Sequence, residues 1–481
     1  MSKTLFSHSY YYQLDAKQWK NKMPFPPLGT LYAASLLRKH NYDVSLFDTN
    51  LLNSPKSIVP VLEKTQPKYL VIYDDGFNYL TKMCLTKMRE ACFKMIDFGK
   101  KNNCIVIVSS SDSTDHYEEY LEKGADFIIK GEGEITLLEL IEALEKKSSL
   151  QSVKSIAYTL NNKILTTEKR NVLVNLDELP LPAWDLIDMD SYKNVWQQSK
   201  QEFTLNIATT RGCPYKCNWC AKPIYGNRYN AHSVKYIVNQ LSFLQKTFGV
   251  QRFWMCDDIF GLKPNWVQEF AAELENQQLK ISYFIQSRVD LLLKEDTIDA
   301  LAKSGLEEVW VGAESGSQKI LDAMDKGTKV EEIYKATHLL KSKKIKVAFF
   351  LQFGYLTENQ SDIDKTIAMI KELKPNNIGI SVSYPLPGTK FYEKVKDDLK
   401  LKANWEDSDD FEMMFKGTYS TKYYKKLQRY VHKQFRISQG IENLKNGQFS
   451  IAKIKSILKL GYYFPSSFLD KIVLKKLQHE G

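Results

Sequence analysis

Short apolar runs alternate with segments of helical periodicity over the first 150 residues of the chain. The candidate strands there read TLFSHSY, DVSLFD, KYLVIYDD, CIVIVSS and DFIIKG, and helical patterns lie between them, including a long one from about Tyr79 to Lys100. Five strands interleaved with helices predict a doubly wound parallel α/β sheet over residues 1–150. Such a sheet binds ligands beyond the carboxyl ends of its strands, here at Asp48, 74–76, 109–114 and 131–134.

Residues 151–202 have a different character and predict a linker that contains a hairpin. The segment SIAYTLNNKILTT reads as two strands that turn at Asn161 and Asn162, because asparagine tolerates the left-handed backbone of a two-residue turn. The segment LDELPLPAWDLI is interrupted by prolines and therefore cannot form a long helix.

The alternation of strands and helices resumes over residues 203–400. The candidate strands read TLNIATT, RFWMCDD, SYFIQSR, EVWVGAE, KVAFFLQF and IGISVSYP. Six such repeats predict a partial (β/α)6 parallel barrel, in which chemistry gathers at the carboxyl ends of the strands. The polar residues at those ends are Asp257, Asp258, Gln286, Arg288, Glu314, Ser315, Gln352 and Tyr384.

The last segment, residues 401–481, is predicted to be helical and basic. Residues 416–481 hold fourteen Lys or Arg and three acids, a net charge of +11 against +10 for the whole chain, so the rest of the protein is nearly neutral. Apolar residues such as Leu458 and Phe468 recur at helical spacing and predict amphipathic helices. Either these helices pack on the barrel with solvated lysines outward, which we favour, or they make peripheral contact with an anionic membrane.

The composition excludes several classes of protein. The 481 residues are 43% apolar, 26% charged and 12% aromatic, which is typical of globular proteins and unlike disordered chains. No stretch reaches the roughly 18 apolar residues of a membrane span, no signal peptide is recognised, and no nucleic-acid-binding module is found. We therefore expect a cytoplasmic protein, with the inner membrane face as the one alternative location.

Three of the seven cysteines stand together in TTRGCPYKCNWCAK, on a loop after the first barrel strand. Cys213, Cys217 and Cys220 have the spacing C-x-x-x-C-x-x-C, so three thiolates on one short loop can converge on one metal centre. A structural zinc site needs a fourth ligand, which is not evident nearby, whereas a 4Fe–4S cluster on three cysteines leaves one iron open. Zinc and three incidental thiols remain as alternatives.

This cysteine spacing, after a strand that opens a six-repeat barrel, resembles the radical S-adenosylmethionine (SAM) superfamily over about residues 203–400. The resemblance implies that Cys213, Cys217 and Cys220 hold a 4Fe–4S cluster. SAM would bind the open iron and be cleaved to a 5′-deoxyadenosyl radical. It also implies that Trp219 lies near the adenine of SAM. The segment VGAESGSQKILDAMDKG is similar to the family's fourth-strand segment and implies that Glu314 and Ser315 line the SAM pocket.

For three further barrel residues a functional and a structural interpretation both stay open. Arg288 either pairs with the SAM carboxylate through its two-pronged guanidinium or takes part in a structural ion pair. Asp257 and Asp258 either contact SAM or substrate or cap a helix.

The first domain resembles the flavodoxin-like cobalamin-binding domain that precedes the barrel in one branch of this superfamily. The matching segments are PPLGTLYAASLLRKHNYDVSLFD, GADFIIKGEGE and LDELPLPAWDLI. In the second, Gly131, Glu132, Gly133 and Glu134 follow a strand and open a helix, where backbone can approach a ligand; a plain tight turn is the alternative. The chain lacks the D-x-H-x-x-G motif whose histidine ligates cobalt in some cobalamin proteins, and SSSDST stands where relatives often have a Gly-Gly-Pro-His-like turn.

The resemblance thus implies a cobalamin-dependent radical SAM enzyme that methylates an unactivated carbon of a small-molecule or lipid-like substrate. Its expected cofactors are a 4Fe–4S cluster, SAM and cobalamin, with electrons from an external donor. Cyclisation or rearrangement by an enzyme of the same branch is one alternative. A non-catalytic cobalamin or iron–sulfur sensor is another, and the regular polar residues at the barrel strand ends argue against it.

Overall fold

The computed structural model describes residues 3–78, 81–82, 85–402, 404–406, 408, 410–445 and 451–478. The chain divides into two compact units. The first contains Met1–Pro214, Lys222–Tyr283 and Asn404–Asp410, and the second contains Tyr215–Ala221, Phe284–Ala403 and Phe411–Gly481. The first unit therefore joins the N-terminal sheet to the opening strands of the barrel.

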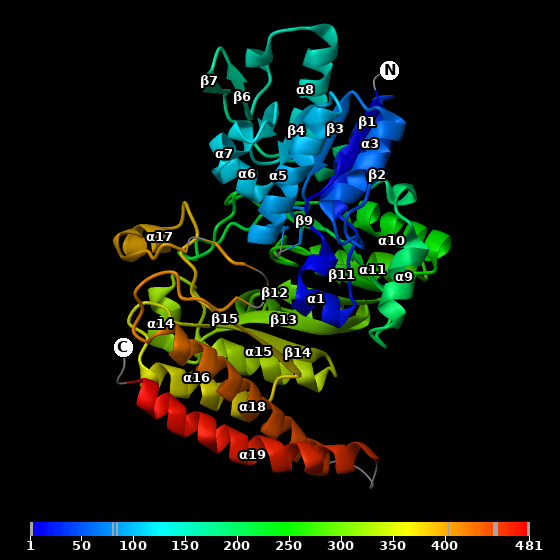
Figure 1. Ribbon diagram of the computed structural model, residues 1–481. Coiled ribbons are helices and arrows are strands. Elements are labelled where there is room, and N and C mark those ends of the chain that lie inside the picture. The colour runs from blue at the N-terminus through cyan, green and yellow to red at the C-terminus, as the bar shows by residue number, and fades with distance from the viewer. Residues whose placement is uncertain are drawn as a thin grey trace. The chain divides into compact units, whose positions relative to one another are not determined.

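The first unit holds a seven-stranded sheet in the order β2-β1-β3-β4-β5-β6-β7 (Figure 1). Its strands are β1 (Lys3–Ser7), β2 (Asp43–Phe47), β3 (Tyr69–Tyr73), β4 (Ile105–Ser109), β5 (Phe127–Ile129), β6 (Ile156–Leu160) and β7 (Lys163–Thr166). Strands β1 to β5 pair in parallel. The order 2-1-3-4-5 is that of the flavodoxin-like doubly wound fold, so the predicted sheet is confirmed.

Helices cover both faces of this sheet, because alternate residues of a buried strand point to opposite sides. Leu70 and Ile72 of β3 lie in a core with residues of α3 (Val59–Thr65), α5 (Thr86–Lys101) and α7 (Tyr117–Glu122). The helices α2 (Leu28–Lys39) and α8 (Glu134–Lys146) contact each other and do not contribute to that core.

The helix predicted from about Tyr79 begins later than expected. α5 starts at Thr86, because the backbone of Leu85 is extended and interrupts the helical pattern. Tyr79 itself lies outside the described residues.

The hairpin predicted at Asn161 and Asn162 is present and extends the first sheet. Both residues have a left-handed backbone, with φ of 49° and 59°, as a two-residue hairpin turn requires. β6 pairs antiparallel with β5 as well as with β7. The rest of the linker contains α9 (Met189–Gln197) and two short 3₁₀ turns at Leu176–Glu178 and Trp184–Leu186, so its proline-rich segment forms no long helix.

The six predicted barrel strands form one curled sheet in the order β15-β14-β13-β12-β11-β8. They are β8 (Thr204–Ile207), β11 (Arg252–Met255), β12 (Ser282–Ser287), β13 (Leu306–Glu314), β14 (Lys346–Phe353) and β15 (Asn377–Val382). The pairs β8–β11, β13–β14 and β14–β15 are parallel. The partial barrel predicted from sequence is therefore confirmed.

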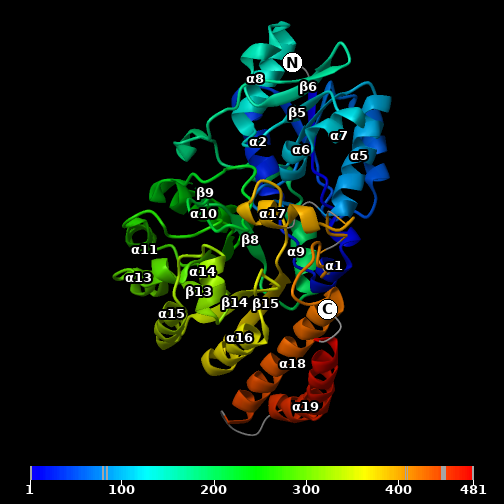
Figure 2. The same ribbon diagram turned by 90° about the vertical axis from the view of Figure 1, so that its left-hand side faces the viewer.

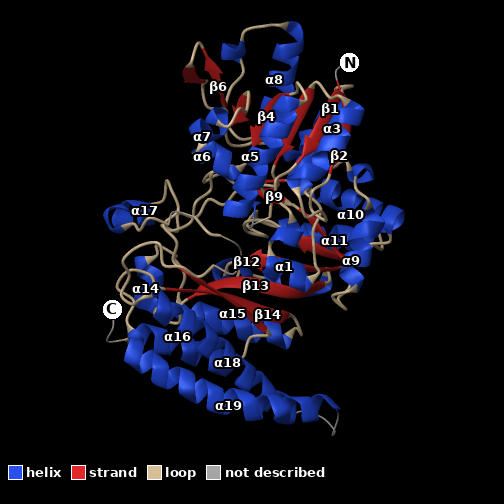
Figure 3. Cartoon of the chain, viewed as in Figure 1, coloured by secondary structure: helices blue, strands red, loops and turns tan. Residues whose placement is uncertain are grey.

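Helices alternate with these strands, as Figure 3 shows by colour. The longer ones are α10 (Val234–Phe248), α11 (Trp266–Asn276), α13 (Thr297–Lys303), α15 (Val330–Ser342) and α16 (Gln360–Leu373). Shorter ones are α12 (Val289–Leu292), α14 (Gln318–Ala323) and α17 (Lys390–Val395). The C-terminal region forms two long helices, α18 (Thr421–Lys445) and α19 (Ile451–Leu477). Figures 1 and 2 show α18 between α16 and α19.

Candidate functional site

The cysteine motif lies on the loop between β8 and α10, and a short strand pair closes the base of this loop. β9 (Thr210–Arg211) pairs antiparallel with β10 (Asn230–Ala231). Gly212, directly before the first cysteine, has a φ of 78°, and a Cβ there would lie 2.3 Å from the carbonyl oxygen of Arg228. Only glycine fits this turn, so the Arg-Gly dipeptide positions the first thiol.

Among the described residues, the three thiols of the motif form no disulfide, and each is partly exposed. Cys213 belongs to the first unit, whereas Cys217 and Cys220 belong to the second. Within the part of the chain that the structure describes, no three Cys, His, Asp or Glu side chains are gathered closely enough to hold a metal ion. As a donor set, three thiols suit a 4Fe–4S cluster with one open iron better than a four-ligand zinc site.

A buried guanidinium lies against the second cysteine. Nη1 of Arg288 is 3.9 Å from Sγ of Cys217 and donates to the carbonyl oxygen of Lys326 at 2.8 Å. Asp290 holds the same side chain at 2.9 Å, and the guanidinium lies 3.7 Å from the ring centre of Tyr215. In this arrangement Arg288 takes part in a structural ion pair, the second of its two predicted roles.

A second buried cation, which the sequence analysis did not single out, stands close to the same cysteine. Nζ of Lys326 is 2.7 Å from Oε1 of Glu314, and both side chains are buried. Burial disfavours the charge of Lys326, but Glu314 and then Cys217 offset this and raise the pKa of the ammonium. Glu314 thus already pairs with one ammonium group.

The backbone around Glu314 has an irregular conformation that accommodates its ion pair with Lys326. Glu314 has a φ of 55°, which is costly for a residue with a side chain, and the β13–β14 register shifts between Gly312 and Glu314. A Cβ on Gly312 would lie 2.6 Å from Nζ of Lys326. The glycine therefore leaves the room that the ammonium occupies.

The two other residues predicted for SAM binding have different surroundings. Ser315 is fully buried, and its hydroxyl lies 3.1 Å from Oγ1 of Thr366 and accepts from the amide of Ser317. Its contacts in the structure are therefore internal to the barrel. Trp219 is half-buried, and its Nε1 is enclosed without a hydrogen-bond partner in the described structure. An enclosed indole N–H without an acceptor is a position at which a ligand can bind.

Asn218 anchors the middle of the cysteine motif, a role that sequence reasoning missed. Its amide Nδ2 donates to the carbonyl oxygen of Ala323, and Oδ1 accepts from the hydroxyl of Tyr355, both at 2.7 Å. Its backbone N–H donates to the carbonyl oxygen of Met324. The loop segment that carries Cys217 and Cys220 is thereby fixed to the second unit. The available signal in the sequence was an asparagine directly after Cys217, within the cysteine motif.

In the first unit, the residue two positions before Cys213 is joined to the loop predicted to bind cobalamin. Nη1 of Arg211 lies 2.5 Å from Oε1 of Glu132, and Nη2 lies 2.7 Å from Oε1 of Glu134. All three side chains are less than 10% exposed. Both glutamates predicted as cofactor-binding residues therefore use their carboxylates to hold the base of the cysteine loop.

The two glycines of the same loop serve close packing. Gly131 has a φ of 82°, and its amide donates to Oγ1 of Thr114. A Cβ on Gly133 would lie 2.8 Å from the hydroxyl of Tyr73 and 2.9 Å from Oγ of Ser109. Glycine is thus required where α8 starts against β3 and β4, as the tight-turn interpretation states.

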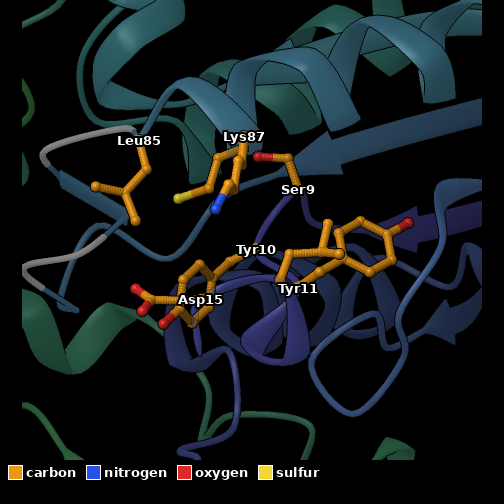
Figure 4. A pocket seen from close by; sticks show the side chains of 8 residues that line it. Ser9, Tyr10, Tyr11, Asp15, Leu85 and Lys87 are labelled. Atoms are coloured by element: carbon orange, nitrogen blue, oxygen red, sulfur yellow. The ribbon is translucent and has the colours of Figure 1, made fainter. Parts of the chain in front are cut away.

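The other polar residues at the carboxyl edge of the first sheet bind one another. Asp48 pairs with His8 at 2.8 Å, Asp74 accepts from the amide of Ser9 at 2.6 Å, and Ser110 and Ser113 cap the short helix α6 (Ser111–Asp115). Burial raises the pKa of the Asp74 carboxyl. A cavity of about 10 Å³ lies beyond β1 and is lined by Ser9, Tyr10, Tyr11, Leu14, Asp15, Leu85, Lys87 and Met88. Figure 4 shows these side chains as sticks. This volume admits about one water molecule.

Asp257 supports the cysteine loop and caps no helix in the described structure, so the capping interpretation was wrong for it. Its carboxylate accepts from the amides of Thr209 and Thr210 at 2.7 Å and from the Thr209 hydroxyl. Burial raises the pKa of this carboxyl to about 7. Asp258 forms an ion pair with Lys82 instead.

Glu358, on the loop between β14 and α16, is a further buried carboxyl that the sequence analysis did not identify. It accepts from the amide of Gly354 at 2.6 Å, and its Oε1 has no hydrogen-bond partner in the described structure. Burial raises the pKa of Glu358 to about 8, well above the unfolded value of about 4.3. The folded state therefore binds the proton more tightly than the unfolded state.

Because the pKa of Glu358 is higher in the folded than in the unfolded state, the free energy of unfolding should decrease as the pH rises from about 4.3 to 8. Replacement of Glu358 by Gln keeps an acceptor for Gly354 and removes the titration. We expect the melting temperature of E358Q minus that of the wild type to increase from about pH 5 to pH 8. The exposed residue Glu331 provides the control variant E331Q. A difference that is equal at all pH values would contradict the prediction.

The chain is similar to proteins of known family and to solved structures. Residues 207–370 match the family model of the Radical SAM superfamily. The chain is 27% identical over 385 residues to an uncharacterized methyltransferase of Pyrococcus horikoshii, which covers 79% of this chain and 81% of the relative. It is 26% identical over 332 residues to an anaerobic magnesium-protoporphyrin IX monomethyl ester cyclase of Synechocystis, which covers 67% and 64%.

A solved structure resembles almost the whole chain. It is that of the cobalamin-dependent S-adenosylmethionine radical enzyme OxsB with aqua-cobalamin and S-adenosylmethionine bound. The TM-score is 0.73 at 18% identity, over 99% of this chain and 72% of that one. At this identity, the likeness establishes that the two chains share a fold.

Proposed function

We propose that this protein, a radical SAM enzyme whose radical SAM domain spans residues 207–370, is a cobalamin-dependent methyltransferase that acts on an unactivated carbon of a small organic or lipid-like molecule. The domain implies a 4Fe–4S cluster and SAM as cofactors. When bound, the cluster supplies the electron that cleaves SAM to a carbon-centred radical, and cobalamin carries a methyl group. An external donor would return the electron.

The observation that carries the cluster assignment is the surroundings of Cys217. Cys213, Cys217 and Cys220 would be the iron ligands, as their spacing predicts. Arg288 lies against the sulfur of Cys217, and Lys326 adds a second buried positive charge. These two buried positive charges would compensate the negative charge of a cluster bound there.

The polar groups of the second unit support a SAM site at the carboxyl ends of the barrel strands. The carboxylate of Glu314 already accepts a hydrogen bond from the ammonium of Lys326, and the same carboxylate would accept one from the ammonium of SAM. Within the cysteine motif, Nε1 of Trp219 is enclosed and has no hydrogen-bond partner in the described structure. Such a donor suits a polar ligand. In this proposal Trp219 and Glu314 bind SAM, and Ser315 and Arg288 position the residues around them.

Support for cobalamin is of a different kind, because it comes from the strand order of the first sheet. The side chains at the carboxyl edge of that sheet bind one another, and Ser9, Tyr10 and Leu85 line a cavity of about 10 Å³ beside them. Glu132 and Glu134 hold Arg211, while Gly131 and Gly133 provide the close turn beside this edge.

Transfer of isotope from the methyl group of SAM tests the proposed reaction. The anaerobically reconstituted protein would be incubated with cobalamin, a reductant, methyl-labelled SAM and extracts that contain candidate substrates. We expect a product that gains the label. A product with altered rings and no label would instead support a cyclase, the activity that names the Synechocystis relative. Cleavage of SAM without any modified product would contradict both assignments.

A further inference from the structure

The outer surface of α19 is apolar. Sixteen large hydrophobic side chains are exposed in the part of the chain that the structure describes. Eight of them lie on this one helix: Ile457, Leu458, Tyr462, Phe464, Phe468, Leu469, Ile472 and Val473. Leu458 is 71% exposed and Phe468 is 65% exposed. An apolar patch of this extent usually marks an interaction surface.

The inner surface of α19 is largely polar, which is the reverse of an ordinary packed helix. Ser456, Leu460, Ser467, Asp470 and Leu474 are its buried side chains. Nζ of Lys433 lies 2.6 Å from Asp470, which Lys426 also contacts, and Gln434 donates to Ser467 at 2.6 Å. These contacts all join α19 to α18.

The same contacts fix the rotation of α19 about its axis. A rotation that buried the apolar side chains against α18 would move Asp470 away from Lys433 and Lys426. Asp470 would then lose both ion pairs, whether it became exposed or stayed buried. The two helices are also close, because a Cβ on Gly440 would lie 2.8 Å from Leu460. These contacts with α18 therefore keep the apolar surface of α19 exposed. The interpretation favoured from the sequence, in which the apolar sides of both helices pack on the barrel, does not hold for α19.

The charges on α19 indicate what covers this surface. At about 100° per residue, the eight exposed apolar side chains span about half of the helix circumference. Lys459 and Lys471 stand at the two borders of that half, and Lys475 and Lys476 follow at its C-terminal end, all exposed. Lysines at the border of an apolar face extend their ammonium groups toward lipid phosphates while their methylene chains stay apolar.

We propose that α19 docks this protein on an anionic membrane surface, with the helix lying in the plane of the lipid headgroups. A second copy of the chain fits the surface less well, because a symmetric pair would place like-charged lysines against each other. No helix in the described ranges is long and apolar enough to cross a bilayer. The proposal does not depend on the proposed methyl transfer, because binding to vesicles requires neither the cluster nor SAM.

Flotation with lipid vesicles tests this docking. The full-length protein would be mixed with vesicles of phosphatidylcholine and phosphatidylglycerol, or of phosphatidylcholine alone. We expect flotation with the mixed vesicles and binding weaker by about tenfold or more to the neutral ones. Replacement of Leu458, Phe468 and Leu469 by Ser should weaken binding by more than about tenfold.

Matched variants separate docking from a general effect of surface apolarity. Leu160, Val174 and Leu339 are exposed at other places, and their replacement by Ser should leave flotation unchanged. Replacement of Lys459, Lys471 and Lys475 by Glu should abolish the preference for anionic vesicles. Circular dichroism would establish that each variant is folded.

Two results would overturn the proposal. One is equal flotation of the wild type and the L458S/F468S/L469S variant. The other is a lipid-free dimer of the wild type that the same variant converts to a monomer, with no flotation of either protein, since this would identify a second copy as the occupant.

Discussion

Replacement of Cys217 by Ala removes the iron–sulfur absorbance of the reconstituted protein and lowers its iron content by about tenfold or more. The loss is expected to be nearly complete because a cluster on three cysteines has no spare protein ligand. In addition, Arg288 and Lys326 would keep only their partners Asp290 and Glu314 and would lose the negative charge of the cluster beside them. Iron analysis and absorbance after anaerobic reconstitution measure the effect.

Cys256 provides the matched control for this variant. It is buried, and its thiol donates to the carbonyl oxygen of Ile207 in the adjacent strand, but it lies outside the C-x-x-x-C-x-x-C motif. Cys256→Ala should retain its iron. Full iron content in Cys217→Ala, or equal loss in the two variants, would contradict the ligand assignment.

Replacement of Arg211 by Met is expected to destabilise the first unit by about 3–5 kcal/mol. The guanidinium is the buried partner of both Glu132 and Glu134, so its removal leaves two carboxylates buried without a counter-charge. Urea titration monitored by tryptophan fluorescence measures the loss. The exposed ion pair of Arg38 with Asp185 gives a matched control, because Arg38→Met should cost about 0–1 kcal/mol.

Two further measurements identify the cause of the Arg211 effect. Glu132→Gln and Glu134→Gln, added to Arg211→Met, should restore part of the lost stability, because neutral amides tolerate burial better. Burial already raises the pKa of Glu132, and without Arg211 it should raise that pKa further. Stability of Arg211→Met should therefore increase as the pH falls toward the unfolded pKa of about 4.3. Equal losses in Arg211→Met and Arg38→Met would contradict this account.

The sequence predicted the two sheets well, because their signals are local. Each barrel strand is a short run of β-branched, aromatic or other apolar residues that is followed by polar residues, as in KVAFFLQF and EVWVGAE. The hairpin at Asn161 and Asn162 was predictable for the same reason, since asparagine favours the left-handed backbone that the turn needs. The helix expected from Tyr79 was misplaced because Leu85 has an extended backbone. Leucine is a good helix former, so its residue type did not indicate this interruption.

The connections within the candidate site could not be predicted, because they join distant positions. Arg211 and Glu132 are 79 residues apart, and Lys326 meets Glu314 across a turn of irregular backbone. Sequence alone gave both glutamates of the loop a cofactor-binding role, whereas in the structure their carboxylates hold Arg211. The three cysteines were recognisable because their spacing is itself the signal.

The helix α19 shows a different limit of sequence patterns. Its periodicity predicted an apolar side, and that side exists. The opposite side is polar and holds Asp470, while Lys459 and Lys471 stand at the borders between the two. Periodicity does not say which side is buried, and this was decided by Asp470 and Ser467, which bind α18. The favoured expectation that the apolar side packs inward was therefore wrong for this helix.

Formation of 5′-deoxyadenosine from SAM by the reduced, cluster-loaded protein tests the central claim most directly. The account predicts that the wild type and Cys256→Ala produce it, and that Cys217→Ala does not. Absence of 5′-deoxyadenosine from a wild-type preparation that holds a full complement of reduced cluster would contradict the assignment of this protein as a radical SAM enzyme.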